Sequence, residues 1–166
     1  KEYRRQRQMC IRDRVCAMDH YGHGKSGGKK GDIPSMEYML NSVDAFIQAV
    51  YKQYGTLPAV LYGHSMGGNV VANYLIQKNQ QFKVAVITSP WLVLPQAPPA
   101  WRILLAKVMM KIYPSYQDKT GLDTKAISRD AAAVAAYEQD PLVHEYMTPR
   151  FYFAMEEAGL MAIDYT

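Results

Sequence analysis

The sequence of 166 residues contains only two cysteines, Cys10 and Cys16. Two thiols cannot build a disulfide framework, and no zinc spacing can be formed from them, so small disulfide-rich and zinc-ribbon domains are excluded. Long apolar runs are also missing, although 49% of the residues are apolar, so no segment is predicted to cross a membrane. The scarcity of thiols favours a reducing compartment, and we expect a cytoplasmic protein that uses neither a metal nor a cofactor.

Most of the chain carries no net charge. The formal net charge is +4, and residues 1–14 carry all of it, with six basic and two acidic side chains. We call these residues the basic head. The remaining 152 residues hold equal numbers of basic and acidic side chains. A balanced body does not indicate a nucleic-acid partner.

The basic head has three competing interpretations. It is a plain solvated terminus, or a functional arm for nucleic acid or anionic membranes, or an artefact. The arm would need basic residues grouped on one face or beside aromatics, and only Tyr3 is aromatic there. The artefact is suggested by the string RQRQMCIRDR, which resembles sequencing-adapter DNA translated as part of a gene. A secretory signal is excluded because no apolar core follows the charges.

Strands and helices are predicted to alternate in residues 15–90. A helix should start after Ser35, which can cap it, and end at Gly55. A second helix should follow the glycine-rich turn at residues 63–68. Short apolar runs predict strands at residues 15–18, 59–62 and 83–87. This alternation predicts the α/β class, with a parallel sheet and flanking helices.

Residues 91–148 follow a different pattern, which we interpret as a helical cap or lid inserted over the sheet. No strand is predicted after Ile87, and a helix near residues 149–160 should return toward the core within residues 149–166. One cap helix has an apolar stripe, which either accepts a flexible acyl chain or packs on the sheet. The stripe consists of Trp101, Leu104, Leu105, Val108, Met109 and Ile112.

The strongest chemical signal is the pattern G-x-S-x-G at Gly63-His64-Ser65-Met66-Gly67. It is typical of a nucleophile elbow, in which a tight turn from strand to helix holds a serine in a strained conformation. We expect glycines on both sides of the serine to relieve steric clashes. The helix that follows would direct backbone amides toward a developing negative charge. Ser65 is therefore the candidate nucleophile.

A serine nucleophile needs a histidine base and an acid that orients it, and in this fold class both follow the serine in the chain. His20 and His23 precede the serine, and His64 is its neighbour, so only His144 is available. Asp140 lies four residues before His144, and the two would stack on one helix face. No strand is predicted between residue 87 and this pair, however, so a histidine on the cap surface is the competing interpretation.

These segments together resemble the monoacylglycerol lipase and lysophospholipase branch of the α/β-hydrolases, often labelled serine aminopeptidase-like. Residues 19–26 read DHYGHGKS and are similar to a family loop, with Tyr21 where arginine is usual. The elbow continues to Gly68, as in the family pattern G-H-S-M-G-G. Ser89-Pro90 and the cap residues 122–130, 135–137 and 140–144 also match. The resemblance covers residues 15–160 and implies an internal fragment with a partial α/β-hydrolase fold.

Carried onto this sequence, the resemblance implies that Ser65 is the nucleophile and that the Met66 amide is one oxyanion donor. The second donor, the triad acid and the triad base would lie outside this chain, which leaves Asp140 and His144 as a weak alternative. The remaining matched residues are assigned to shaping the elbow and the loop: Gly63, His64, Gly67, Gly68, Asp19, His20, Gly22, His23 and Gly24.

The implied activity is hydrolysis of carboxylic esters through an acyl-enzyme, with a monoacylglycerol or lysophospholipid as substrate. The cap would touch a membrane surface transiently, and no nucleic acid is expected. Two alternatives remain open: a catalytically inert fragment, and a binding module that uses the basic head. The sequence gives no oligomeric state.

Overall fold

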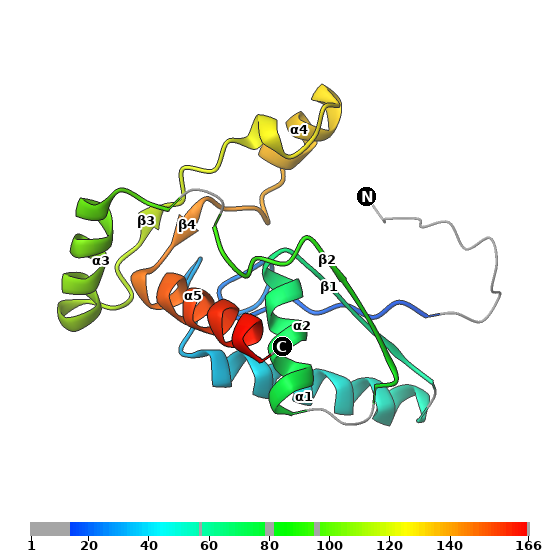
Figure 1. The fold of residues 1–166 in the computed structure, drawn as a ribbon. Coiled ribbons are helices and arrows are strands. Elements are labelled where there is room, and N and C mark those ends of the chain that lie inside the picture. The colour runs from blue at the N-terminus through cyan, green and yellow to red at the C-terminus, as the bar shows by residue number, and fades with distance from the viewer. Residues whose placement is uncertain (1–13, 57, 79–81, 95–96, 166) are drawn as a thin grey trace.

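A computed structural model describes residues 14–56, 58–78, 82–94 and 97–165 (Figure 1). Residues 1–13 lie outside the described ones, so the interpretations of the basic head stay predictions. Arg14 is the described part of that head, and its guanidinium lies 4.4 Å from the centre of the Tyr54 ring. Within the described residues, no helix combines the length and apolarity needed to span a bilayer.

Helix α1 (Met36–Tyr54) forms where capping and periodicity predict it. The Ser35 hydroxyl accepts a hydrogen bond from the Tyr38 amide at 3.1 Å, which satisfies one of the free amides at the helix start. Gly55 ends the helix with φ of 80°, a conformation that favours glycine. The buried face of the helix consists of Met39, Leu40, Val43 and Ile47.

Strands β1 (Val60–His64) and β2 (Val84–Thr88) are parallel, in register from Val60 opposite Val84 to His64 opposite Thr88. Helix α2 (Met66–Gln77) connects them and packs on both strands. The α/β class and the parallel sheet are therefore confirmed.

The strand predicted at residues 15–18 is wrong. These residues adopt no regular structure, and the Val15 side chain is 92% exposed. A strand needs a neighbour to satisfy its backbone hydrogen bonds. In the part of the chain that the structure describes, β1 and β2 pair with each other and neither pairs with residues 15–18.

The core lies between α1, α2 and α5 (Pro149–Asp164), which Figure 1 shows grouped on one side of the two strands. Two buried asparagines fasten α2 to α5. Asn69 donates to the Met155 carbonyl at 3.0 Å, and Asn73 donates to the Ala158 carbonyl at 2.9 Å. Because buried amides are costly without partners, these bonds fix the register of the two helices.

The excursion between β2 and α5 contains more than helices. Its helices are α3 (Ala100–Ile112), the short 3₁₀ helix η1 (Thr124–Ala126) and α4 (Ala131–Glu138). Its strands β3 (Asp118–Lys119) and β4 (Tyr146–Met147) pair antiparallel. The prediction of no strand after Ile87 is therefore wrong, because two-residue strands are too short to show alternation in the sequence.

Helix α3 stands away from β1 and β2 and contacts α5 (Figure 1). None of its residues is buried, and Trp101 and Ile112 are 66% and 75% exposed. The interpretation that its apolar stripe packs on the sheet is therefore wrong. The stripe is divided instead between solvent and a cavity beside α5.

Candidate active site

Ser65 occupies the turn between β1 and α2 with φ of 52° and ψ of −116°. Its backbone is held from several sides: its amide donates to the Thr88 carbonyl at 3.1 Å, and its carbonyl accepts from the Trp91 amide at 2.9 Å. A non-glycine residue at positive φ persists only where its surroundings enforce it. The side chain is exposed beyond the end of β1. The strained elbow expected from the motif is present.

The glycines around Ser65 do not all serve the same purpose. A Cβ atom on Gly63 would lie 2.2 Å from the Gly67 carbonyl oxygen, and one on Gly68 would lie 3.0 Å from Pro90. A Cβ atom on Gly67 would meet no described atom within 4 Å. The expectation of clashes on both sides of the serine is thus confirmed at Gly63 and wrong at Gly67. Gly67 instead supplies the carbonyl that a side chain at position 63 would strike.

The start of α2 presents free backbone amides beside Ser65. The Gly68 and Asn69 amides donate to the Ser65 carbonyl at 3.0 and 3.2 Å. The Met66 and Gly67 amides precede them, and the first amides of a helix have no partner within it. Met66 N–H therefore stays available to an oxyanion, as an oxyanion donor must be.

None of the hydrogen bonds found for the described histidines reaches Ser65. The His64 ring nitrogen Nδ1 bonds the Thr88 hydroxyl at 2.9 Å, so its imidazole is turned toward β2. Asp140 and His144 do not stack, because residues 140–144 are not helical. The Asp140 carboxylate accepts from the Leu142 amide, and the two His144 nitrogens bond the Gly22 carbonyl and the Tyr146 amide. The weak alternative, in which Asp140 and His144 stack on one helix face, is therefore wrong.

The glycine-rich loop closes on itself, as a structural element would. The Asp19 carboxylate accepts from the Lys25 amide at 2.9 Å, and His23 Nδ1 bonds the Tyr21 carbonyl at 3.0 Å. Gly22 and Gly24 have φ of 73° and 53°. A Cβ atom on Gly24 would lie 2.3 Å from the Asp19 carboxyl carbon, so this turn requires glycine.

Two apolar cavities lie beside α5. One of about 70 Å³ is bordered by Trp91, whose amide bonds the Ser65 carbonyl. The other, of about 130 Å³, lies between α3, the β3–β4 pair and the start of α5. Leu94 and Tyr152 border both cavities. Burial, followed by a hydrogen bond to Glu156, raises the pKa of Tyr152 to about 12, so its phenol is neutral at physiological pH.

A family model described as serine aminopeptidase, S33, matches residues 13–163. The chain belongs to this family. It is 33% identical over 135 residues to a monoacylglycerol lipase of Mycolicibacterium smegmatis, covering 81% of this chain and 48% of that protein. Human monoglyceride lipase is 30% identical over 130 residues, which cover 78% of this chain and 43% of the human protein. The chain thus spans about half the length of the relatives it matches.

The solved structure of Paleococcus ferrophilus monoacylglycerol lipase matches with a TM-score of 0.77 and 32% identity, over 88% of this chain and 55% of that one. A soluble variant of the Saccharomyces cerevisiae monoglyceride lipase, solved with a substrate analogue, matches with a TM-score of 0.67 and 27% identity. That match covers 85% of this chain and 48% of the yeast chain. These likenesses place this S33 chain in the monoacylglycerol lipase branch of the α/β-hydrolases.

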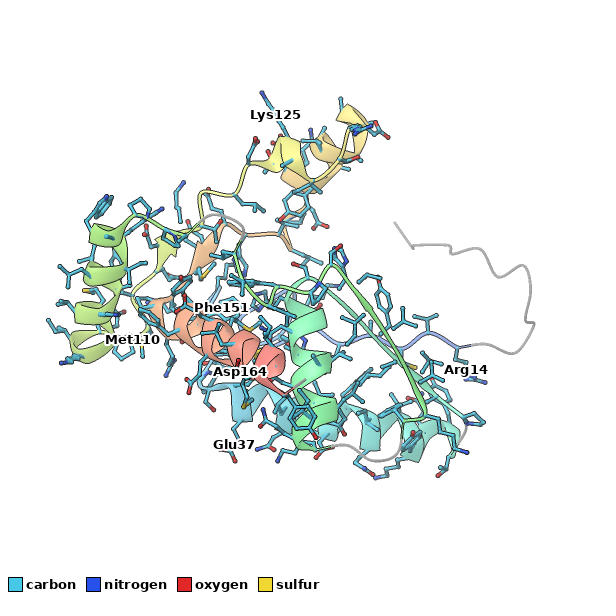
Figure 2. The ribbon with its side chains drawn as sticks, in the orientation of Figure 1. Arg14, Glu37, Met110, Lys125, Phe151 and Asp164 are labelled. Atoms are coloured by element: carbon cyan, nitrogen blue, oxygen red, sulfur yellow. The ribbon has the colours of Figure 1, made fainter. Side chains whose placement is uncertain are left out.

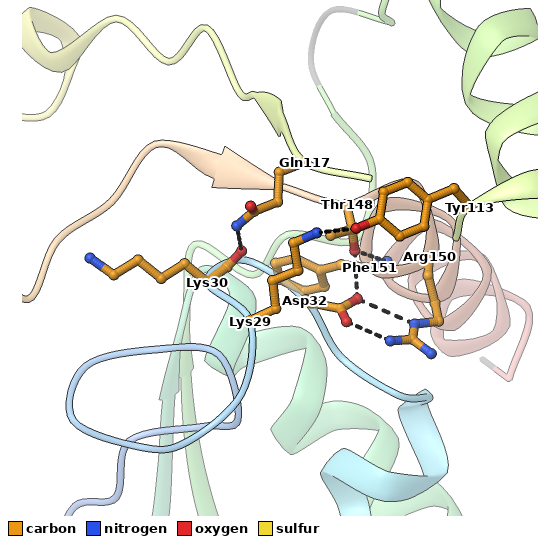
Figure 3. Close-up of polar contacts among 8 residues, drawn as sticks. All are labelled: Lys29, Lys30, Asp32, Tyr113, Gln117, Thr148, Arg150 and Phe151. Carbon is orange, nitrogen blue, oxygen red and sulfur yellow. Dashed lines mark hydrogen bonds and ion pairs between the residues drawn. The ribbon is translucent and has the colours of Figure 1, made fainter. Parts of the chain in front are cut away.

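One polar cluster in this S33 chain was missed by the sequence analysis. The Asp32 carboxylate is buried and bonds Thr148 and Arg150, more than 100 residues away (Figure 3). No local pattern marks Asp32, because its partners come from the other end of the described chain. The cluster lies between the glycine-rich loop and the start of α5.

Acid should destabilise this fold through two loop histidines. Burial lowers the pKa of His20, and the nearby His23 lowers it further; burial also lowers the pKa of His23. Both imidazoles therefore take up protons at a lower pH in the folded chain than in the unfolded chain, where uptake begins once the pH falls to about 6.5. The free energy of unfolding should be unaffected by these groups above pH 7.5 and should fall below pH 6.5.

Urea unfolding at pH 8, 7.5, 6 and 5 measures this dependence, and His23→Gln should make the decline below pH 6.5 shallower. The midpoints at pH 8 and 7.5 are the internal control. A decline that is equally steep in the variant would rule out His23 as a contributor.

Proposed function

We propose that this chain carries the nucleophile and the cap of a serine hydrolase that cleaves carboxylic esters through an acyl-enzyme. The observation that carries the proposal is the strained, exposed Ser65 at the start of α2, beside the first backbone amides of that helix. Ser65 Oγ would attack the ester carbonyl, and the Met66 amide would hold the resulting oxyanion. The alcohol then leaves, and water hydrolyses the acyl-Ser65 ester to release the acid.

The attack requires a base, and none of the described histidines is hydrogen-bonded to Ser65. Following the family resemblance, we assign the base, its acid and the second oxyanion donor to residues outside this chain. The same proposal divides the chain into core residues 15–90, cap residues 91–148 and a returning helix in residues 149–166. If those partners are required, the 166 residues alone are the inert alternative.

The cavities support a lipid ester as the substrate. Their lining is mostly aliphatic and aromatic, and the 70 Å³ cavity begins at Trp91, next to the nucleophile. Cavities of this composition suit an acyl chain, whose methylene groups gain about 0.8 kcal/mol each on burial. We therefore propose monoacylglycerol or lysophospholipid as the substrate class, as in the relatives named monoacylglycerol and monoglyceride lipase.

Release of fatty acid from monoolein and from lysophosphatidylcholine, by a protein that contains this chain together with the assigned base and acid, tests the activity. An aminoacyl anilide tests the peptidase alternative. Ester cleavage that depends on Ser65 supports the proposal. Cleavage of the anilide alone would replace the ester substrate by a peptide. A fluorophosphonate probe that fails to label Ser65 in this chain would favour the inert alternative.

The exposed face of α3 should hold the protein at the surface where such a lipid resides. Trp101, Leu104 and Ile112 are each at least 65% exposed, and Lys107 and Lys111 lie on the same helix. An interfacial helix combines such apolar and basic residues. We expect the double change Trp101→Gln and Leu104→Gln to weaken binding to phosphatidylcholine vesicles about tenfold, because it removes two apolar anchors.

Vesicle co-sedimentation measures this binding. Tyr62→Gln is the matched control, since Tyr62 is 62% exposed but lies on β1, away from the cap. If both variants lose the same amount of vesicle binding, the binding is a nonspecific effect of exposed apolar side chains and does not depend on the exposed face of α3.

A further inference from the structure

The glycine-rich loop contacts two segments that lie on either side of η1 and α4 in the sequence. We call residues 113–120, which follow α3, the outgoing leg, and residues 144–150, which include the first two residues of α5, the return leg. The loop residues 22–32 contact both legs, and Figure 3 shows the contacts that Lys29, Lys30 and Asp32 make with them. The legs lie far from the loop in sequence, so they are joined to it only by tertiary contacts.

Asp32 holds the return leg. Its side chain is 3% exposed, and it accepts a hydrogen bond from the Thr148 hydroxyl at 2.8 Å. The Arg150 guanidinium binds it through two nitrogens, one at 3.2 Å. A two-pronged arginine contact fixes direction as well as distance. The same Thr148 hydroxyl accepts from the Phe151 amide at 3.2 Å and so caps α5.

Backbone contacts reinforce this grip. The Thr148 amide donates to the Gly31 carbonyl at 2.9 Å, and His144 Nε2 donates to the Gly22 carbonyl at 2.9 Å. A Cβ atom on Gly31, where φ is 66°, would lie 1.9 Å from the Tyr146 carbonyl oxygen. The loop and the return leg are therefore in backbone contact, with no room for a side chain between them.

The outgoing leg is held by side chains. Gln117 donates to the Lys30 carbonyl at 2.7 Å, and the Lys29 ammonium donates to the Tyr113 hydroxyl at 2.9 Å (Figure 3). This hydrogen bond lowers the pKa of Tyr113. The Arg150 amide also donates to the Pro114 carbonyl at 3.4 Å, which joins the two legs to each other.

Packed rings connect this grip to the nucleophile. The His23 ring lies 5.6 Å from that of Phe151, which lies 6.0 Å from that of Trp91. The Trp91 amide bonds the Ser65 carbonyl at 2.9 Å. A shift of the first turn of α5, where Phe151 follows the return leg, would therefore displace the turn that carries Ser65, since packed interiors transmit displacement.

We propose that Asp32 is a positioning residue: with Thr148 and Arg150 it clasps the cap to the glycine-rich loop and so sets where the cap cavities stand relative to Ser65. This assignment rests on the proposed ester hydrolysis for its effect on substrate, but the clasp itself does not. Asp32 touches neither substrate nor the reacting atoms. Removing the Asp32 carboxylate should leave the rate of the chemical step unchanged and make the cavities that receive the acyl chain more mobile.

The two halves of the ion pair differ in exposure, which predicts an order of effects. The Arg150 side chain is 33% exposed, so Asp32→Asn leaves a guanidinium that water can reach. Arg150→Met leaves a buried carboxylate without its cation, which is the more costly defect. We expect Asp32→Asn to raise amide exchange in both legs about tenfold and Arg150→Met to raise it further.

Hydrogen–deuterium exchange measures the opening of the two legs. Steady-state hydrolysis of monoolein, by a protein that contains this chain together with the assigned base and acid, measures the effect on substrate. We expect Asp32→Asn to raise KM severalfold while kcat changes less than twofold. Thr148→Ser keeps the hydroxyl and should behave as the wild type, whereas Thr148→Val should behave as Asp32→Asn. The Thr148 pair keeps the test decisive if Asp32→Asn does not fold.

Asp44→Asn is the matched control, because the Asp44 carboxylate accepts from the Tyr74 hydroxyl at 2.6 Å between α1 and α2. It should raise exchange in those helices and not selectively in the legs. Two results for Asp32→Asn would overturn the clasp. One is amide exchange that rises equally in the legs, in α1 and in α2, and the other is amide exchange in the legs that does not change. If a wild-type protein that combines this chain with the assigned base and acid cleaves no ester, the proposed function fails, and the exchange data still decide the clasp.

Discussion

Changing Ser65 to alanine should abolish ester cleavage and fluorophosphonate labelling. Loss of a serine nucleophile lowers kcat by roughly 10⁶-fold when the whole catalytic set is present, because the remaining groups have nothing to act through. The fold should be unaffected, since the Ser65 side chain makes no capping hydrogen bond at the start of α2. Alanine and serine pay a similar cost for the positive φ at this position.

Mass spectrometry of the labelled protein and fatty-acid release from monoolein measure the two losses. Ser89→Ala is the control, because Ser89 is the other non-glycine residue with positive φ in the described chain, at 42°, and it is also exposed. It should keep full labelling. Labelling that survives in Ser65→Ala would place the nucleophile elsewhere and end the proposed mechanism.

Local signals explain which parts of the fold could be predicted. The start and end of α1 depend on Ser35 and Gly55, which act on their own neighbours, so both could be found in the sequence. The strand predicted at residues 15–18 failed because a strand depends on a partner, and apolar composition does not supply one. The β3–β4 pair was missed for the same reason: Asp118 meets Met147 only after the cap has folded back.

The candidate site likewise contains residues that local sequence predicts and residues that it cannot predict. Ser65 was found because strand, turn and helix are adjacent in sequence, and the glycine spacing follows from that turn. The Asp140 and His144 pair was wrong because a spacing of four matters only within a helix, and these residues form none. The clasp at Asp32 was missed because Arg150 lies 118 residues away and neither residue belongs to a local motif.

Gly63→Ala should be one of the most damaging single-methyl changes in this chain. The added Cβ would lie 2.2 Å from the Gly67 carbonyl oxygen and 2.7 Å from a methyl of Val71. The oxygen belongs to the first turn of α2, which is packed against β1 and α5, so it cannot yield without moving the helix. Overpacking of this kind costs about 3 kcal/mol. Urea unfolding should show a lower midpoint with an unchanged slope.

Gly67→Ala separates this contact from the general cost of changing an elbow glycine. Gly67 lies in α2, its φ is not positive, and an added Cβ would meet no described atom within 4 Å. Alanine in a helix is preferred over glycine by about 0.5–1 kcal/mol, so this variant should be as stable as the wild type or slightly more so. Equal destabilisation by the two changes would mean that the motif demands backbone freedom at both positions. If only Gly63→Ala lowers the free energy of unfolding strongly, a single contact explains why the motif needs a glycine at residue 63. In that contact the Gly67 carbonyl leaves no room for a side chain at residue 63.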